Sequence, residues 1–365
     1  MSQLTAALLG LEHPHALAHL RTLQQLPEVG RILVWDANAD ALAQVEATQP
    51  DKVAGLFTDL DALLADPALF FAIASVRNDL GPDVFMRTLA AGKHLMAEKP
   101  IGRTASDAER VIDAARRAGV KLGVCYQNRF TAWAQEARRI VREGLLGPLY
   151  SVEMRMITTQ VQFRSPQHWL FRNEYAGGGI LSWLGCHYID LMRFITGEEI
   201  VSVAAEVATR SGEAIDVEDS AALALRFASG AVGTLHAGYM MALSGGGYFN
   251  KGGYDNYVGV NGRLGRIHWS SSGAPASIYV ESAHTAWGGA PQRTFHYTYA
   301  DSPAYGGVAG EQFIRAFVQS AQGLGEPPTT GEDALRVARV VDAAYESSRT
   351  GRRVDTTITH HSNGG

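Results

Sequence analysis

Short apolar runs alternate with amphipathic stretches through the first third of the chain. The runs are apolar throughout, which is typical of strands in a parallel sheet covered on both faces. Between them, hydrophobic residues recur at about one helical turn. This order predicts an α/β domain built on a doubly wound parallel sheet. The predicted strands are Thr5–Leu11, Arg31–Asp36, Leu69–Val76, Lys93–Glu98 and Lys121–Tyr126, and the predicted helices are Leu17–Leu26, Ala39–Ala47, Val84–Ala91 and Ser106–Ala118, the last with a serine cap.

After Pro148 the pattern changes to alternation, so that Val152, Met154 and Met156 share one face. Ala221–Phe227 and Ala231–Ala237 alternate similarly and are joined by Ser229-Gly230, a hairpin signal. We therefore expect an α+β domain with a large, mainly antiparallel open sheet. Further strands are predicted at Tyr257–Val260, Arg266–Trp269, Ser277–Glu281 and Thr294–Tyr299, and helices at Ala309–Ala321 and Gly331–Arg349.

These patterns predict a dinucleotide-binding domain over 1–127, a second domain over 128–355 and a polar tail over 356–365. The closing helix could pack back on the first domain. A glycine-rich stretch, Ser244–Tyr257, interrupts the second domain as either a loop over the site or a surface irregularity.

Composition excludes several classes of protein. The chain has 365 residues, 46% hydrophobic and 19% charged, which fits two globular domains. A net charge of -5 without a basic stripe argues against nucleic acid as a partner. The N-terminus has no export signal and no apolar run is long enough for a membrane span. With only Cys125 and Cys186, both expected to be reduced thiols, we expect a cytoplasmic protein.

Gly10 ends the first predicted strand, and Pro14 suits the first turn of the helix that follows. In a Rossmann-type fold this turn presents backbone N–H groups to the cofactor pyrophosphate. The G-x-G-x-x-G spacing is not met, because only its first glycine is present and Glu12 stands where the backbone should approach a phosphate. We still expect the loop to bind the cofactor through Gly10, His13, Pro14 and His15.

Asp36 follows the second predicted strand, where an acidic side chain accepts hydrogen bonds from the ribose hydroxyls and repels a 2′-phosphate. It favours NAD, with NADP as the alternative. A competing interpretation is that Asp36 only caps the helix beginning near Ala39.

His13, His15 and His19, together with Glu12, also suggest a metal site. A further ligand in a defined position is not evident from the sequence, so we predict no metal. The histidines are instead expected to be polar residues around a phosphate or a substrate entrance.

Two segments carry the strongest chemical signal. Lys99 follows a strand and precedes Pro100, which places it at the carboxyl end of a parallel strand, where open α/β sheets bind ligands. His187 and Asp190 lie three residues apart in a predicted helix and hence on one face.

These segments resemble the Gfo/Idh/MocA family of NAD(P)-dependent oxidoreductases, and the resemblance extends from Thr5 to Val354. It is carried by AGKHLMAEKP, GGGILSWLGCHYIDLMRFITG, LRFASGAVGTL and AAYESSRTGRRV. The resemblance implies that Lys99 and His187 sit beside the nicotinamide and that Glu98 and Pro100 shape the cofactor site. It also implies that the open face of the second sheet forms the interface of a homodimer or homotetramer. Further cofactor contacts are expected from Ser75, Arg77, Asn78 and Gln127.

One departure from the family pattern matters. Where the family commonly has Asp-x-Gly-x-His, this chain has Trp183-Leu184-Gly185-Cys186-His187. Either Lys99 and His187 suffice, or Asp190 or another acid assists, or ordinary dehydrogenase chemistry is lost. Trp183 either stacks on a sugar-like ring or packs in the interior.

We expect hydride transfer to or from a hydroxyl carbon, with His187 as the base and Lys99 as the cation that holds the oxygen. A polyhydroxylated substrate, a sugar, polyol or sugar acid, would be bound by Asn128, Arg129, Arg164, His168 and Arg172. The arginines favour an acid. Two other functions remain open: bound NAD as an internal redox relay for elimination or glycoside cleavage, and a non-catalytic dinucleotide- or sugar-binding regulatory protein.

Overall fold

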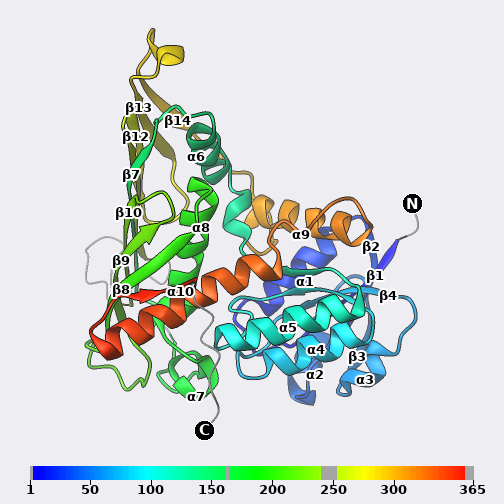
Figure 1. Ribbon diagram of the computed structural model, residues 1–365. Coiled ribbons are helices and arrows are strands. Elements are labelled where there is room, and N and C mark those ends of the chain that lie inside the picture. Colours follow the sequence, from blue (N-terminus) through cyan, green and yellow to red (C-terminus); the bar gives the residue numbers. More distant parts are fainter. Residues whose placement is uncertain (1–2, 162–163, 240–252, 358–365) are drawn as a thin grey trace. The chain divides into compact units, whose positions relative to one another are not determined.

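The computed structural model describes residues 3–161, 164–239 and 253–357 and divides the chain into two compact units (Figure 1). The first contains the chain up to Phe130 together with Tyr299–Leu335, and the second contains Thr131–Thr298 and the chain from Arg336 onward. The predicted boundary after Gln127 remains a prediction, and 299–335 contributes to the first unit. Most of the glycine-rich stretch and most of the tail lie outside the described residues.

The first unit is built on a six-stranded sheet in the order β3-β2-β1-β4-β5-β6, and every neighbouring pair is parallel. This confirms the predicted doubly wound sheet. The sequence analysis did not identify β3 or α3, because β3 is mostly half-buried and lacks a solid apolar run. The strands are β1 (Leu4–Leu9), β2 (Val29–Trp35), β3 (Val53–Phe57), β4 (Leu69–Ala74), β5 (His94–Ala97) and β6 (Leu122–Val124); the helices are α1 (Ala16–Gln25), α2 (Ala39–Ala47), α3 (Leu60–Leu64), α4 (Gly81–Ala90), α5 (Ala105–Ala118), the 3₁₀ turn η1 (Gln127–Phe130) and α9 (Gly307–Ala321).

The core of this unit lies between the sheet and its helices. Phe71 and Ile73 of β4 are fully buried, and Phe317 of α9 packs edge-on against Phe71. This packing explains why α9, which is distant in sequence, belongs to the first unit. Burial of side chains of this size stabilises the fold by about 1.5 to 3 kcal/mol each.

Two details at helix starts differ from the predictions. Helix α5 is capped by Thr104, whose side chain accepts a hydrogen bond from the Asp107 amide, and not by a serine. Helix α1 begins at Ala16 with His15 as its N-cap, so Pro14 lies in the turn before the helix rather than in its first turn.

The second unit contains a nine-stranded sheet in the order β14-β13-β12-β11-β7-β10-β9-β8-β15. Only β7 and β10 pair in parallel among the pairings between these strands, which confirms the mainly antiparallel sheet. The predicted hairpin at Ser229-Gly230 joins β9 to β10, and Gly230 has the positive φ of +94° that such a turn favours. The strands are β7 (Leu149–Thr158), β8 (Ile200–Ala208), β9 (Ser220–Phe227), β10 (Val232–Gly238), β11 (Tyr254–Gly262), β12 (Gly265–Ser271), β13 (Ser277–Ser282), β14 (Gln292–His296) and β15 (Val354–Asp355).

Helices cover one face of this sheet, and in Figure 1 α6 and α8 lie on the same side of it. Strand β8 and helix α6 were not predicted. The helices are α6 (Ala132–Arg142), the turn η2 (Trp169–Phe171), α7 (Asn173–Ala176), the π-helical turn η3 (Leu181–Gly185), α8 (Cys186–Thr196), the turn η4 (Thr285–Trp287) and α10 (Gly331–Thr350), whose first residues belong to the first unit. None of the helices in the described ranges combines the length and apolar character that a membrane crossing requires.

Candidate active site

The loop after β1 needs glycine at its first position. Gly10 has a φ of +93°, and a Cβ atom there would lie 2.4 Å from Val76 Cγ1 and 2.7 Å from the Ser75 carbonyl oxygen. The backbone of this loop therefore lies tight against the end of β4. A side chain would force the loop away from the sheet.

Asp36 connects this loop to the end of β2. Its Oδ2 accepts a hydrogen bond of 2.7 Å from the Leu11 amide, and its Oδ1 accepts one of 2.8 Å from the Asn38 amide. The N-cap of α2 is Asn38, whose side chain accepts from the Asp40 amide. The alternative that Asp36 only caps this helix is therefore wrong. A half-buried carboxylate held beside the glycine loop fits the ribose of a dinucleotide.

Three histidines surround the Glu98 carboxylate, and their place around a phosphate or a substrate entrance stays a prediction. Glu98 Oε1 lies 2.9 Å from His15 Nδ1 and 2.6 Å from His19 Nε2, and His13 is buried next to His15. Burial alone raises the pKa of Glu98, but the neighbouring charge and hydrogen bonds of His15 and the hydrogen bond of His19 hold that pKa well below its usual range. Burial lowers the pKa of His13 and His15. The cluster is thus an ionised carboxylate hydrogen-bonded by His15 and His19.

This cluster supplies the further candidate ligand that the metal hypothesis lacked, since ligand atoms of His13, His15 and Glu98 lie within 4.8 Å of one another. The separations of 2.6 and 2.9 Å at Glu98 are those of hydrogen bonds. Two ligands of a tetrahedral zinc ion, each about 2.0 to 2.2 Å from the metal, would stand farther apart. The arrangement therefore favours a hydrogen-bonded clamp on Glu98.

Because of this hydrogen-bonded clamp on Glu98, we expect the free energy of unfolding to fall at acid pH. Burial lowers the pKa of His15 from 6.5 to about 4. Between these values the unfolded chain binds a proton that the folded chain does not, so stability is full above pH 6.5 and is lost as the pH falls toward 4. The loss from this residue is on the order of 3 kcal/mol. In urea unfolding at stepwise pH, we expect His15→Gln to reduce the pH dependence. The control His296→Gln, at an exposed position on β14, should keep the parent slope, and an unchanged slope in His15→Gln would contradict the assignment.

Lys99 lies at the carboxyl end of β5, as predicted, and is fully buried. Its backbone amide donates a 2.9 Å hydrogen bond to Glu98 Oε2. The His15 and His19 contacts on Oε1 therefore fix, through one carboxylate, the backbone from which Lys99 extends. Pro100 follows Lys99 and prevents the strand from continuing.

Two polar atoms near Lys99 test whether this edge fits a cofactor. Ser75 Oγ and Gln127 Oε1 are buried, and neither has a hydrogen-bond partner among the described residues. Ser75 follows β4 and Gln127 follows β6, and the carboxyl ends of β4, β5 and β6 lie at one edge of the sheet. An unsatisfied buried polar group costs about 1 to 3 kcal/mol, which a bound polar ligand would recover. The residues present therefore fit a dinucleotide.

Arg77 and Asn78 lie at the same edge of the sheet, in the segment that follows β4. Arg77 makes two 2.8 Å hydrogen bonds to Asp79 and lies 3.8 Å from Glu12 Oε1. Burial raises the pKa of Glu12, although the charge of Arg77 opposes the shift. Arg77 thus offsets a carboxylate that would otherwise repel a phosphate. Asn78 is buried in the turn before α4.

In the second unit, His187 and Asp190 lie on α8, and the carboxylate of Glu218 binds the backbone amides at the start of the helical segment that leads into α8. Its Oε2 accepts a 2.7 Å hydrogen bond from the Gly179 amide and its Oε1 a 2.9 Å bond from the Leu181 amide, while its carbonyl oxygen accepts from the Ile180 amide at 3.1 Å. The Tyr345 hydroxyl donates to Oε1 at 2.9 Å. Sequence reasoning missed Glu218, because an acid before a strand gives no signal of the helix start 39 residues away.

His187 and Asp190 lie one turn apart on α8 and are both buried, Asp190 completely. The π-helical turn η3 directly precedes them. Such turns often occur at functional sites, because the extra residue per turn redirects the side chains that follow. Trp183 lies in η3 with only 2% of its surface exposed and packs edge-on against Trp169. This burial supports the packing alternative over stacking on a sugar ring.

The other predicted substrate residues divide between the two units. Arg129 is buried and forms a 3.2 Å ion pair with Asp333, which gives it a structural partner, and Asn128 beside it is half-buried. Arg164, His168 and Arg172 are half-buried residues of the second unit in the segment between β7 and α7. Of these, Arg164 and His168 are neighbours, since the charge of Arg164 acts on the His168 ring.

Comparison with known proteins agrees with this geometry. Residues 6–126 match the family model described as oxidoreductase family, NAD-binding Rossmann fold, and residues 134–269 match the GFO/IDH/MocA C-terminal domain. The chain is 23% identical over 302 residues to a 1,5-anhydro-D-fructose reductase of Ensifer adhaerens, covering 82% of this chain and 83% of that protein. It is 24% identical to a myo-inositol 2-dehydrogenase of Thermotoga maritima, covering 92% and 94%.

A solved structure of levoglucosan dehydrogenase with NADH and levoglucosan superposes with a TM-score of 0.83 at 23% identity, covering 98% of this chain and 100% of that one. At this identity the likeness shows the fold. Together with the two family matches, it establishes that the chain belongs to the GFO/IDH/MocA family of oxidoreductases and carries an NAD-binding Rossmann domain.

Proposed function

We propose that this protein is an NAD-dependent dehydrogenase that oxidises a hydroxyl carbon of a sugar, polyol or sugar acid, or runs the same step in reverse. The observation that carries the proposal is the edge of the parallel sheet in the first unit. There Lys99 extends from a clamped strand end beside two buried polar atoms that lack partners among the described residues. Relatives named as sugar and polyol enzymes support the substrate class.

The reaction removes a hydride from the carbinol carbon and a proton from its hydroxyl, which leaves a carbonyl group. NAD, when bound, accepts the hydride. His187 takes the hydroxyl proton, since an imidazole works as a base near neutral pH. Lys99 holds the oxygen on which negative charge develops. In the reverse direction the same two groups return the proton and polarise the carbonyl.

The aspartate that relatives commonly place at the Trp183 position is not available here. We propose that Asp190, one turn after His187 on α8, stabilises the charge that His187 gains. A carboxylate that orients a catalytic imidazole in this way is a common arrangement. The buried Trp183 then serves the packing of the helix start.

NAD is favoured over NADP by Asp36. Both its oxygens already accept backbone hydrogen bonds, so its charge is fixed beside the glycine loop. A 2′-phosphate at the ribose would meet this charge without a neighbouring arginine in Asp36-Ala37-Asn38 to offset it.

The proposal is tested by following absorbance at 340 nm while the purified protein is incubated with NAD and a panel of sugars, polyols and sugar acids. Net NADH formation with at least one class of substrate is the expected result. Turnover with tightly held NAD and no net absorbance change would select the redox relay instead. Ligand-induced stabilisation without any product would select a binding protein.

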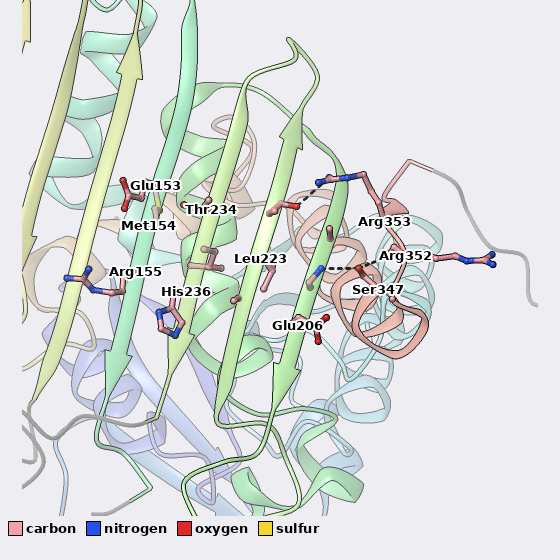
Figure 2. A pocket seen from close by; sticks show the side chains of 16 residues that line it. Glu153, Met154, Arg155, Glu206, Leu223, Thr234, His236, Ser347, Arg352 and Arg353 are labelled. Carbon is pink, nitrogen blue, oxygen red and sulfur yellow. Dashed lines mark hydrogen bonds between the residues drawn. The ribbon is translucent and has the colours of Figure 1, made fainter.

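We also propose that the open face of the nine-stranded sheet joins two copies of the chain. Figure 2 shows this face, where Glu153, Thr234 and His236 project from adjacent strands around a shallow hollow of about 600 Å³. Val232 and Tyr279 lie on the same face and are 54% and 48% exposed. Large exposed apolar side chains on an uncovered sheet face favour association.

Sedimentation velocity tests this contact. The parent protein is expected to sediment as a dimer or tetramer, and Thr234→Arg, which adds a charge at the centre of the face, is expected to sediment as a monomer. The control Arg117→Gln on the exposed side of α5 should keep the parent mass. A monomeric parent protein would contradict the proposal.

A further inference from the structure

A group of hydrogen-bond donors gathers at one end of the nine-stranded sheet. Tyr254 begins β11 opposite Thr158, the last residue of β7. Tyr239 follows Gly238, which pairs with Ile157 of β7. Arg164 lies in the turn after β7, and its charge acts on both tyrosine hydroxyls. Three chain segments therefore bring Arg164, Tyr239 and Tyr254 together within the second unit.

Arg164 lacks a counter-ion in the described part of the chain. The groups that act on its charge are Tyr239 and Tyr254, and no described carboxylate is among them. The residues outside the described ranges include no aspartate or glutamate. Burial lowers the pKa of the Arg164 guanidinium, which reflects the cost of holding a cation there without a partner.

The two tyrosines add donors rather than acceptors. The Tyr239 side chain is 3% exposed, and its hydroxyl has no hydrogen-bond partner among the described residues. The Tyr254 hydroxyl accepts a 2.9 Å hydrogen bond from Gln160 Nε2, so its own proton is left to be donated. Gln160 is held in turn by Trp183, whose Nε1 donates to Gln160 Oε1 at 3.2 Å.

Aromatic rings surround these donors. Trp169, Phe171, Trp183 and Tyr239 belong to one buried cluster, which includes the π-helical turn just before His187. His168 lies next to Arg164, and burial together with that charge lowers the pKa of His168 to about 4, so it is neutral near pH 7. Glu218 also acts on Tyr239, but its carboxylate oxygens already accept from the Gly179 and Leu181 amides and the Tyr345 hydroxyl. Among the described groups that act on these donors, Arg164 is the one cation.

We propose that Arg164, Tyr239 and Tyr254 bind the carboxylate of the substrate, so that the preferred substrate is a sugar acid rather than a neutral sugar or polyol. A guanidinium donates two parallel hydrogen bonds to the two oxygens of a carboxylate, and phenol hydroxyls donate to the remaining lone pairs. One cation matches the single negative charge of a carboxylate, whereas a phosphate monoester carries nearly two at neutral pH. Gln160 positions Tyr254 and is itself positioned by Trp183. This inference rests on the proposed dehydrogenase function and specifies its substrate class.

The test compares matched substrates with the holoprotein and NAD: D-glucuronate against D-glucose, D-galacturonate against D-galactose, and D-gluconate against D-glucitol. We expect at least one acid to exceed its neutral counterpart about a hundredfold in kcat/KM. Arg164→Gln should abolish that preference by raising KM for the acid about a hundredfold while changing the neutral sugar less than threefold. Tyr239→Phe should raise KM for the acid about tenfold.

Two further variants keep the result interpretable. Arg164→Lys retains the charge without the fork and should recover part of the acid preference, which a merely structural arginine would not show. Arg210→Gln, at an exposed position of the same unit, is the control and should match the parent protein. Equal kcat/KM for acids and neutral sugars, a preference for D-glucose 6-phosphate, or an Arg164→Gln effect of the same size on both substrate classes would overturn the inference.

Binding measured without turnover separates this inference from the proposed function. Calorimetric titration of the NADH-loaded protein with each acid should give a dissociation constant that weakens about a hundredfold in Arg164→Gln. If such binding occurs and no substrate is oxidised, the carboxylate site stands and the dehydrogenase proposal fails. If neutral sugars are oxidised and no acid binds, the dehydrogenase proposal stands and the carboxylate site fails. If nothing in the panel binds, the carboxylate site is also refuted.

Discussion

Lys99→Ala and His187→Ala are each expected to lower kcat about a thousandfold while the protein still binds NADH. A positioned base contributes about 10²- to 10⁴-fold to proton transfer, and a cation at a developing oxyanion contributes about 10²- to 10³-fold. Both side chains are buried, His187 on α8 and Lys99 just after the end of β5, so each is held in place before substrate arrives. The measurement is the rate of NADH formation with the best substrate from the panel.

Measuring NADH binding by each variant shows whether a low kcat reflects the loss of a catalytic group or misfolding of the protein. Titration of each variant with NADH, followed by fluorescence, should give a dissociation constant within about tenfold of the parent value, because we propose that the adenosine half of the cofactor is bound at Gly10 and Asp36, away from both substitutions. The control for Lys99 is Lys93→Ala at the opposite end of β5, where the amine bonds the carbonyl oxygens of Asp66 and Leu69. The control for His187 is His296→Ala on β14.

The double variant Lys99→Ala/His187→Ala provides a further test. If the two groups act on the same step, removing both should cost little more than removing the more important one, as for other residues that act as a unit. Multiplied losses would indicate independent roles. Near-parent rates in both single variants would end the catalytic assignment.

Gly179→Ala is expected to destabilise the second unit by about 3 kcal/mol or more and to lower kcat at least a hundredfold. A Cβ atom at this position would lie 1.9 Å from the Glu218 carbonyl oxygen, and a backbone atom cannot move aside as a flexible side chain can. The helix start would have to shift away from Glu218, with loss of the hydrogen bonds to Gly179 and Leu181. Overpacking of this kind costs about 1 to 3 kcal/mol, and each hydrogen bond to a charged group about 1.5 to 3 kcal/mol more.

The effect on kcat follows because the same helix carries His187. A displacement of about 1 Å at a catalytic group can cost a hundredfold in rate. Urea unfolding and turnover are measured together, and the control is Gly273→Ala, where an added Cβ meets no atom within 4 Å. Parent-like stability and rate in Gly179→Ala would show that Glu218 does not set the position of this helix.

Much of the fold was predictable because its signals are local. The solid apolar runs of β1, β2, β4 and β5 follow from burial on both faces of a parallel sheet, and the alternation in β7, β9 and β10 follows from one covered face. The elements that were missed, such as β3 and β8, are largely half-buried and so carry a weak pattern.

The site divides in the same way. The positions of Lys99 after a strand and of His187 and Asp190 on one helix were readable from the sequence, because each depends on neighbours within a few residues. The burial of Trp183 and the ion pair of Arg129 with Asp333 were not, because each depends on a segment that folds back from elsewhere. The contact of His15 with Glu98 was not readable either, because 83 residues separate the two in the sequence.

The sequence by itself therefore determined the two sheet types, the strand end that presents Lys99 and the helix that carries His187. Each of these depends on hydrophobic periodicity and on residues that end helices or strands, and such signals involve only neighbours within one or two turns. Only the tertiary structure decided which charges meet. Glu98 is hydrogen-bonded by His15 and His19, and Asp36 accepts a hydrogen bond from the loop after Gly10. Glu218 accepts hydrogen bonds at the start of the helical segment that carries His187. The charge of Arg164 interacts with two tyrosines and with no described carboxylate. The physical reason is that hydrogen bonds and charges act through space, and the distances that matter are set by how the sheets bring remote segments together.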